Sequence, residues 1–178
     1  SPEMETPKLL WLAENRPGLR RVALCAQRDA LGLPSLATYR AAFESAGMPI
    51  VKELLYAGAP SDPDAMVDAL LSAEPDILCW DTAYESVVHA LTEAAYRKGF
   101  KGQILSCTCD NYPALIERTS REFMEGFVFQ FPDFDDPALN DARVDFPRPA
   151  EFFAEFNRRF PGEWSAVSWQ YCAILEMW

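Results

Sequence analysis

The chain has 178 residues, of which 49% are hydrophobic and 24% charged, a composition typical of a folded domain with a buried core. Its 27 acidic and 16 basic residues give a net charge of -11, which disfavours binding to nucleic-acid backbones and to anionic membrane surfaces. No apolar run in the sequence approaches the roughly 20 residues that a membrane-spanning helix needs.

Polar and apolar periodicity predicts strands that alternate with helices. Thr6 and Pro7 are typical of a helix N-cap and first helical residue, so an incoming helix is expected to begin there. The pattern predicts strands at residues 21–27, 49–56, 77–79, 103–106 and 126–131. Helices are predicted at residues 34–46, 61–74, 87–98, 113–121, 150–160 and 164–178. A capping box of Ser61 and Asp64 is expected to open the helix at 61–74.

The run Ile77-Leu78-Cys79 shows no alternation, which is typical of a parallel strand buried on both faces. We therefore predict an α/β fold: a doubly wound, Rossmann-like, five-stranded parallel sheet with helices on both faces. The charged pair Lys52-Glu53 favours an edge position for its strand. The whole chain is expected to be one domain, with an incoming helix at 1–17, the core at 18–132, a surface excursion at 133–149 and C-terminal helices at 150–178.

In open parallel sheets, ligands bind outside the carboxyl ends of the strands. The polar and aromatic residues that follow the predicted strands are Arg28, Asp29, Trp80, Asp81, Thr82, Tyr84, Thr108, Asp110 and Asn111. We expect Trp80 and Tyr84 to clamp an apolar group, and Asp81 or Asp110 to bind an ammonium group. Arg28 is expected to bind a carboxylate or to pair with Asp29. Each Asp, Thr and Asn also fits a helix cap or a turn, so both interpretations stay open for any one of them.

Sequence motifs for nucleotide binding and for nucleophilic catalysis are absent. His89 is the single histidine and shares a helical face with Glu85 and Glu93, which indicates a solvated surface residue. The five cysteines form no C-x-x-C pair and are expected to be small buried side chains. We therefore expect neither catalysis nor a cofactor nor a metal site.

A series of short motifs runs from about residue 19 to the end of the chain. Its members are the strand, acidic loop and helix at 21–36, Ala46-Gly47, Tyr56-Ala57-Gly58-Ala59-Pro60-Ser61-Asp62, Glu74-Pro75-Asp76-Ile77, Gly99 and Trp169-Gln170-Tyr171-Cys172-Ala173. In this order and spacing the series resembles the second lobe of type I periplasmic solute-binding proteins. These are the branched-chain amino-acid receptors of ABC transporters.

The resemblance implies a two-lobed receptor that closes on a small amino acid, an amide, or an organic or aromatic acid. It implies ligand contacts from Leu31, from residues 80–85 and from residues 107–111. Leu31 replaces an aromatic residue that is frequent in the family, and Asp110 lies near the position of a Glu that pairs with a ligand ammonium. These departures make an ordinary branched-chain amino acid a doubtful solute.

The resemblance also implies partners and a location for the chain. The expected partners are a missing N-terminal lobe and a membrane permease, and the expected location is periplasmic or otherwise extracytoplasmic. The start at Ser1-Pro2-Glu3 and the stop at Met177-Trp178 inside a helical pattern predict a piece of a longer protein. An exposed inter-lobe face would favour a homodimer of this piece.

Two other classes of protein use the same architecture. A receiver-like phospho-acceptor signalling domain would place Asp29, Asp81 and Thr108 around Mg²⁺, but the sequence has Phe131-Pro132 where such a domain needs a lysine. A hydrolase or a small-molecule sensor on this fold is the other alternative, because fold does not determine function. The sequence offers no nucleophile–base pair for a hydrolase.

Overall fold

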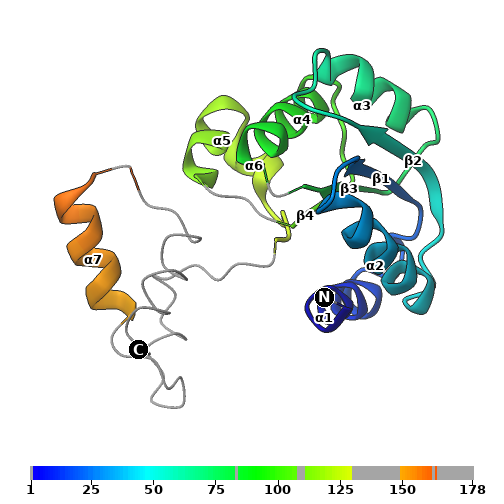
Figure 1. Ribbon diagram of the computed structural model, residues 1–178, viewed down its shortest axis with the longest axis horizontal. Coiled ribbons are helices and arrows are strands. Elements are labelled where there is room, and N and C mark those ends of the chain that lie inside the picture. The colour runs from blue at the N-terminus through cyan, green and yellow to red at the C-terminus, as the bar shows by residue number, and fades with distance from the viewer. Residues whose placement is uncertain (1, 83, 108–110, 130–148, 162, 164–178) are drawn as a thin grey trace. The chain divides into compact units, whose positions relative to one another are not determined.

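Four parallel strands form the central sheet of the computed structural model, which describes residues 2–82, 84–107, 111–129, 149–161 and 163 (Figure 1). The strand order across the sheet is β2-β1-β3-β4. The strands are β1 (Val22–Gln27), β2 (Ile50–Tyr56), β3 (Ile77–Asp81) and β4 (Gln103–Ser106). The predicted α/β fold with a parallel sheet is confirmed, and the strand with Lys52 and Glu53 lies at an edge as expected.

The prediction of a fifth strand at residues 126–131 is wrong for the residues described. Val128 alone pairs with the edge of β4: Ser106 N donates to Val128 O at 2.9 Å, and Val128 N donates to Ile104 O at 3.1 Å. Gly126 has a φ of +81°, and Phe127 N donates to Met124 O at 3.1 Å. The chain is therefore still in a turn where the apolar pattern suggested that the strand begins.

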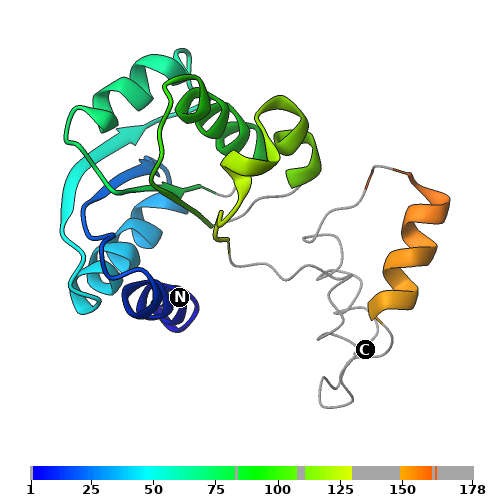
Figure 2. The same cartoon turned by 180° about the vertical axis from the view of Figure 1, so that it is seen from behind.

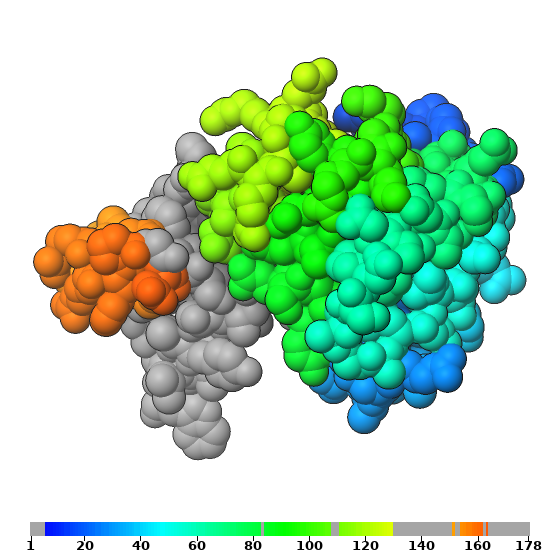
Figure 3. Space-filling view, turned by 90° about the horizontal axis from the view of Figure 1, so that it is seen from above, coloured from blue at the N-terminus to red at the C-terminus, as the bar shows by residue number. Residues whose placement is uncertain are grey.

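Helices cover both faces of the sheet (Figures 1 and 2). α1 (Pro2–Asn15) and α2 (Gly32–Ser45) pack on one face, in a core cluster with Leu9, Leu12, Tyr39 and Phe43. The helices that contribute to the core cluster of the other face are α3 (Pro63–Leu71), α4 (Glu85–Arg97), α5 (Tyr112–Arg118) and α6 (Arg121–Met124). Figure 3 shows this second face, with α3 in teal, α4 in green and the α5–α6 segment in yellow-green.

The alternating side chains of β1 go to different core clusters. Val22, Leu24 and Ala26 pack with α1 and α2, whereas Ala23 and Cys25 pack with the helices of the other face. Every residue of β1 is consequently buried. This explains why the strand has an apolar middle without an in-and-out pattern.

The predicted N-caps of two helices are wrong. α1 already begins at Pro2, so Pro7 lies inside the helix and Thr6 is not its cap. Burial of Leu9 and Leu12 against α2 stabilises this helix although proline removes one of its hydrogen bonds. The N-cap of α3 is Asp62, whose Oδ1 accepts from Ala65 N at 2.9 Å. Since Pro63 is pre-organised as the first helical residue, the cap falls on Asp62 instead of Ser61.

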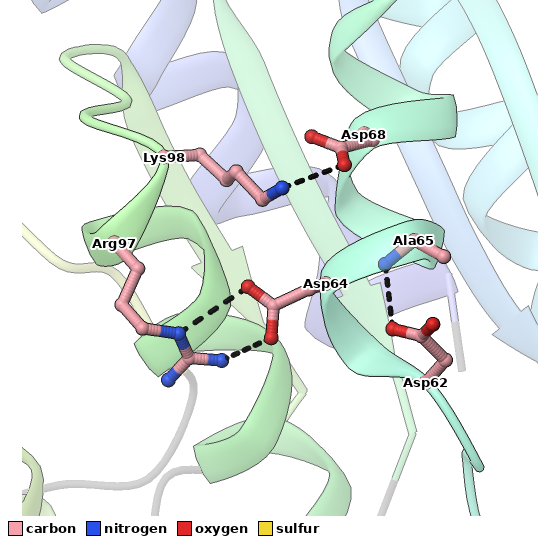
Figure 4. A network of polar contacts seen from close by, with 6 residues as sticks. All are labelled: Asp62, Asp64, Ala65, Asp68, Arg97 and Lys98. Atoms are coloured by element: carbon pink, nitrogen blue, oxygen red, sulfur yellow. Dashed lines mark hydrogen bonds and ion pairs between the residues drawn. The ribbon is translucent and has the colours of Figure 1, made fainter.

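Ion pairs join α3 to α4 on the surface of the second face. Figure 4 shows Arg97 donating to both oxygens of Asp64, at 3.3 and 2.6 Å, and Lys98 donating to Asp68 at 2.6 Å. The bond to Arg97 lowers the pKa of Asp64. All four side chains are well exposed, so water and salt screen these pairs and they contribute little to stability.

Asp76 joins the start of β1 to the start of β3. Its Oδ2 accepts from Arg21 N at 2.9 Å and from Arg20 N at 3.0 Å, and these backbone bonds lower the pKa of Asp76. Asp76→Asn should therefore lower the free energy of unfolding by about 1 kcal/mol at pH 7, because the amide accepts these bonds more weakly than the carboxylate.

The difference between Asp76→Asn and the parent chain should depend on pH. Folding lowers the pKa of Asp76, so its carboxylate stabilises the folded chain fully at a pH above the pKa of the unfolded chain, which is about 4. This stabilisation is lost as the pH falls through the pKa of the folded chain. Urea denaturation of both chains at pH 7 and near pH 3 measures this. A difference that does not change with pH would show that the charge of Asp76 contributes nothing.

The chain divides into two compact units, residues 1–130 and residues 131–178. In the second unit, α7 (Pro149–Arg159) matches the predicted helix at 150–160 within one residue at each end. Arg158 and Arg159 both donate to Glu155 and lower its pKa to about 2. The predicted excursion at 133–149, apart from its last residue, and the predicted helix at 164–178 lie outside the described residues. No helix of the described part is long and apolar enough to cross a membrane.

Candidate functional site

The candidate site lies at the carboxyl ends of the neighbouring strands β1 and β3. Ala26 pairs with Asp81, so the loops that leave these strands start side by side. The loop after β1 leads to α2 on one face of the sheet, and the loop after β3 leads to α4 on the other face. In doubly wound proteins, ligands bind outside the strand ends at the point where the chain diverges in this way.

The loop after β1 is organised around Asp29. Its Oδ1 accepts from Gly32 N at 2.7 Å and from Leu31 N at 3.0 Å, and its Oδ2 accepts from the Gln27 side-chain amide. Gly32 lies against the carbonyl of Gln27, where an added Cβ would be 2.0 Å from the oxygen. Only glycine allows this close approach, which turns the chain from β1 into α2.

A second set of bonds connects this loop to the loop after β3. Thr82 Oγ1 donates to Gln27 Oε1 at 3.3 Å and accepts from Tyr84 N at 3.2 Å. Gln27 and Thr82 are both buried. The two loops are thus joined from Asp29 through Gln27 and Thr82 to the backbone of Tyr84.

Asp81, the last residue of β3, is only 2% exposed. Its Oδ1 accepts from Ser35 Oγ of α2 at 2.6 Å. Burial, helped by the charge of Asp81, raises the pKa of the Cys25 thiol to about 12. Burial likewise raises the pKa of Tyr56 to about 12, so both groups are neutral at physiological pH.

The prediction that Trp80 clamps a ligand is wrong for this structure, because its side chain is fully buried. It belongs to the core cluster that faces α4, and its indole Nε1 donates to Thr92 Oγ1 of that helix at 3.1 Å. Trp80 is the last of four successive fully buried residues in β3.

Besides these hydrogen-bonded residues, the two loops have exposed apolar and charged side chains. Leu31 is 72% exposed, Tyr84 is 50% exposed and Leu33 is 48% exposed. Arg28 is exposed as well, and its backbone N donates to Tyr56 O at 2.7 Å. These side chains are free to contact a solute because the packing of the domain does not use them.

The loop after β4 is described in part. Cys107 N donates to Trp80 O at 3.2 Å, which holds the start of this loop beside β3. Asn111 is exposed, has a φ of +51° and stands at the N-cap of α5 without a side-chain capping bond. The predicted site residues Thr108 and Asp110 lie outside the described residues.

The interpretation of His89 as a solvated surface residue is wrong, since the residue is only 6% exposed. Arg118 of α5 reaches back over α4, with Nη2 2.8 Å from His89 Nδ1 and Nη1 3.1 Å from Glu93 Oε1. Glu85 Oε1 lies 3.6 Å from His89 Nε2 on the other side. The periodicity of α4 does not reveal that a later helix covers its polar face.

The described part of the chain contains no group of three or more His, Cys, Asp and Glu side chains that could hold a metal ion. Asp29 and Asp81, which the receiver-like alternative would need as Mg²⁺ ligands, bond to the loop backbone and to Ser35. This geometry gives no support to that alternative.

Comparison with protein families decides the class of protein. A family model described as periplasmic binding protein matches residues 1–178. The chain belongs to this family. No curated protein matches the chain at a significant level.

Solved structures of other proteins show a similar fold. A leucine binding protein from Thermotoga maritima is 20% identical with a TM-score of 0.68, and the match covers 89% of this chain and 43% of that protein. An extracellular ligand-binding receptor from Rhodopseudomonas palustris HaA2 is 18% identical with a TM-score of 0.76, and the match covers 93% of this chain and 46% of that protein. A solute binding protein from R. palustris in complex with 4-hydroxybenzoate is 16% identical with a TM-score of 0.52, and the match covers 60% of this chain and 29% of that protein. The chain spans less than half the length of each of these proteins.

Sequence reasoning located the two central loops but did not assign their roles to three residues that build them. Gln27 and Ser35 provide the bonds that hold Asp29 and Asp81, and Gly32 provides the close approach at the turn. The one available signal was a lone glycine between an acidic residue and a helix, directly after a strand. The partner of Asp81 was not visible, since Ser35 is 46 residues away in the sequence.

Proposed function

We propose that the chain is one lobe of an extracytoplasmic solute receptor of an ABC transporter and that it binds its solute at the carboxyl edge of β1 and β3. The observation that carries this proposal is that Leu31 and Tyr84 are exposed on two loops that hydrogen bonds of Asp29 and Thr82 hold in place. Preformed sites with apolar walls and a few fixed polar groups are typical of small-molecule binding.

The proposed function needs no chemical step. A second lobe, outside this chain, would close over the solute, and a membrane permease would receive the closed form. The solute stabilises that form only through contacts with both lobes. The chain alone should therefore bind its solute weakly, with a dissociation constant in the millimolar range or above.

An amide NMR titration of the chain tests the position of the site, because it detects weak binding. The panel holds aliphatic and aromatic amino acids, their amides, and aliphatic and aromatic carboxylates. We expect shifts at residues 27–33 and 82–85 with at least one of these solutes. Shifts confined to other parts of the chain would contradict the proposed site.

Leu31→Ala and Tyr84→Ala should each weaken binding about three- to tenfold, since each removes apolar contact area from the solute. Both side chains are largely exposed, so the urea midpoint should stay unchanged. Leu10→Ala is the matched control, because Leu10 is an exposed leucine on α1. An equal loss of affinity in the control would show that the effect is not local to the site.

A further inference from the structure

The carboxylates of Asp29 and Asp81, at the ends of β1 and β3, already accept hydrogen bonds from other groups of the protein. We propose that this edge therefore recognises solutes by an apolar body and an anionic group, and that Asp29 and Asp81 are positioning residues and not ammonium ligands. The inference rests on the proposed function and names the class of solute for the same site.

Asp29 uses both of its oxygens within the loop after β1. Two backbone N–H groups donate to Oδ1, and the side-chain amide of Gln27 donates to Oδ2. A ligand ammonium would have to compete with these three donors. Their loss would release Leu31 and Gly32, the residues that shape the start of α2.

Asp81 is shielded in a different way. Its carboxylate is 2% exposed, and Ser35 of α2 donates to it at 2.6 Å. The bonded pair of Gln27 and Thr82 joins the same two loops. A solute ammonium would reach Asp81 only after these loops separate.

The exposed groups at this edge have a different character. Arg28 is the exposed residue directly after β1, and the bond from its backbone N to Tyr56 O fixes where its side chain starts. Glu85 stands in the first turn of α4, with its carboxylate 3.6 Å from the ring of His89. Leu31 and Tyr84 add apolar surface. Arg28 and the exposed Leu31 belong to the same loop, and a guanidinium together with apolar surface fits a carboxylate on a hydrocarbon or aromatic body.

Matched pairs of solutes that differ only in the ammonium group test this inference by amide NMR titration of the 178-residue chain. The pairs are 3-phenylpropanoate with phenylalanine, and 4-methylpentanoate with leucine. We expect the deaminated acid of at least one pair to shift residues 27–33 and 82–85 and to bind about tenfold more tightly than its amino acid.

Two variants separate the roles of the charged groups. Arg28→Gln should weaken binding of the acid about tenfold, whereas Arg16→Gln, an exposed control before β1, should leave it unchanged. Asp29→Asn should weaken binding of the acid less than Arg28→Gln does, because the Asn oxygen still accepts from the backbone. A turn of the Gln27 amide then restores its bonds to residue 29 and to Thr82.

The outcomes distinguish this inference from the function on which it rests. Tighter binding of both amino acids than of their deaminated acids, or a loss of binding in Asp29→Asn greater than in Arg28→Gln, would overturn the inference and leave the receptor site in place. Absence of shifts at residues 27–33 and 82–85 with every solute would overturn both.

Discussion

Gly32→Ala is expected to lower the free energy of unfolding by about 2 kcal/mol and to abolish solute binding at the edge of β1 and β3. The added Cβ would lie 2.0 Å from the Gln27 oxygen and 2.8 Å from its carbonyl carbon. These are backbone atoms at the end of β1, a strand held between β2 and β3. The start of α2 would have to move instead, and with it the bonds from Gly32 and Leu31 to Asp29.

Gly18→Ala is the matched control for this prediction, because nothing lies within 4 Å of a Cβ at that position. Its free energy of unfolding should stay within about 0.5 kcal/mol of the parent value. Urea denaturation measures the stability of both variants, and the NMR titration measures their binding. If Gly32→Ala matched the control in both experiments, the close approach at Gly32 would not shape the site.

The fold could be predicted from the sequence because its elements are signalled locally. The four strands of the sheet fall within two residues of the predicted ranges, since each is a short apolar run between turn residues. Gly47, with a φ of +65°, follows α2 as expected. The apolar run at residues 126–131 misled the prediction, because apolarity alone does not show whether a segment has a partner for its whole length.

The candidate site could be predicted only in its position. Asp29, Asp81 and Thr82 lie at the strand ends as expected, but their bonds come from residues that no local pattern connects to them. For Asp29 the turn-forming interpretation, left open from the sequence, describes the geometry observed. The burial of His89 was hidden for the same reason, since Arg118 covers it from a helix 29 residues further on.

Trp80→Ala is expected to destabilise the chain by about 4 kcal/mol and thereby to leave much of it unfolded. From the sequence, Trp80 was expected to clamp the solute, and under that expectation the variant would reduce binding and leave the fold intact. The side chain is fully buried between β3 and α4, so its removal creates a cavity in the core. It also frees the hydroxyl of Thr92 from its bond to the indole.

Trp80→Phe separates the hydrogen bond from the volume of the ring and should cost about 1–2 kcal/mol. Trp11→Phe is the control, because Trp11 is 51% exposed on α1, and its cost should stay below about 0.5 kcal/mol. Urea denaturation followed by circular dichroism compares the three variants without relying on tryptophan fluorescence. A stability of Trp80→Ala close to that of the parent chain would mean that the ring is not in the core and would return Trp80 to the candidate site. The expected order of stability losses, with Trp80→Ala the largest and Trp11→Phe the smallest, would instead show that Trp80 anchors β3 in the core. The carbonyl of Trp80 also accepts a hydrogen bond from Cys107 N at the start of the next loop.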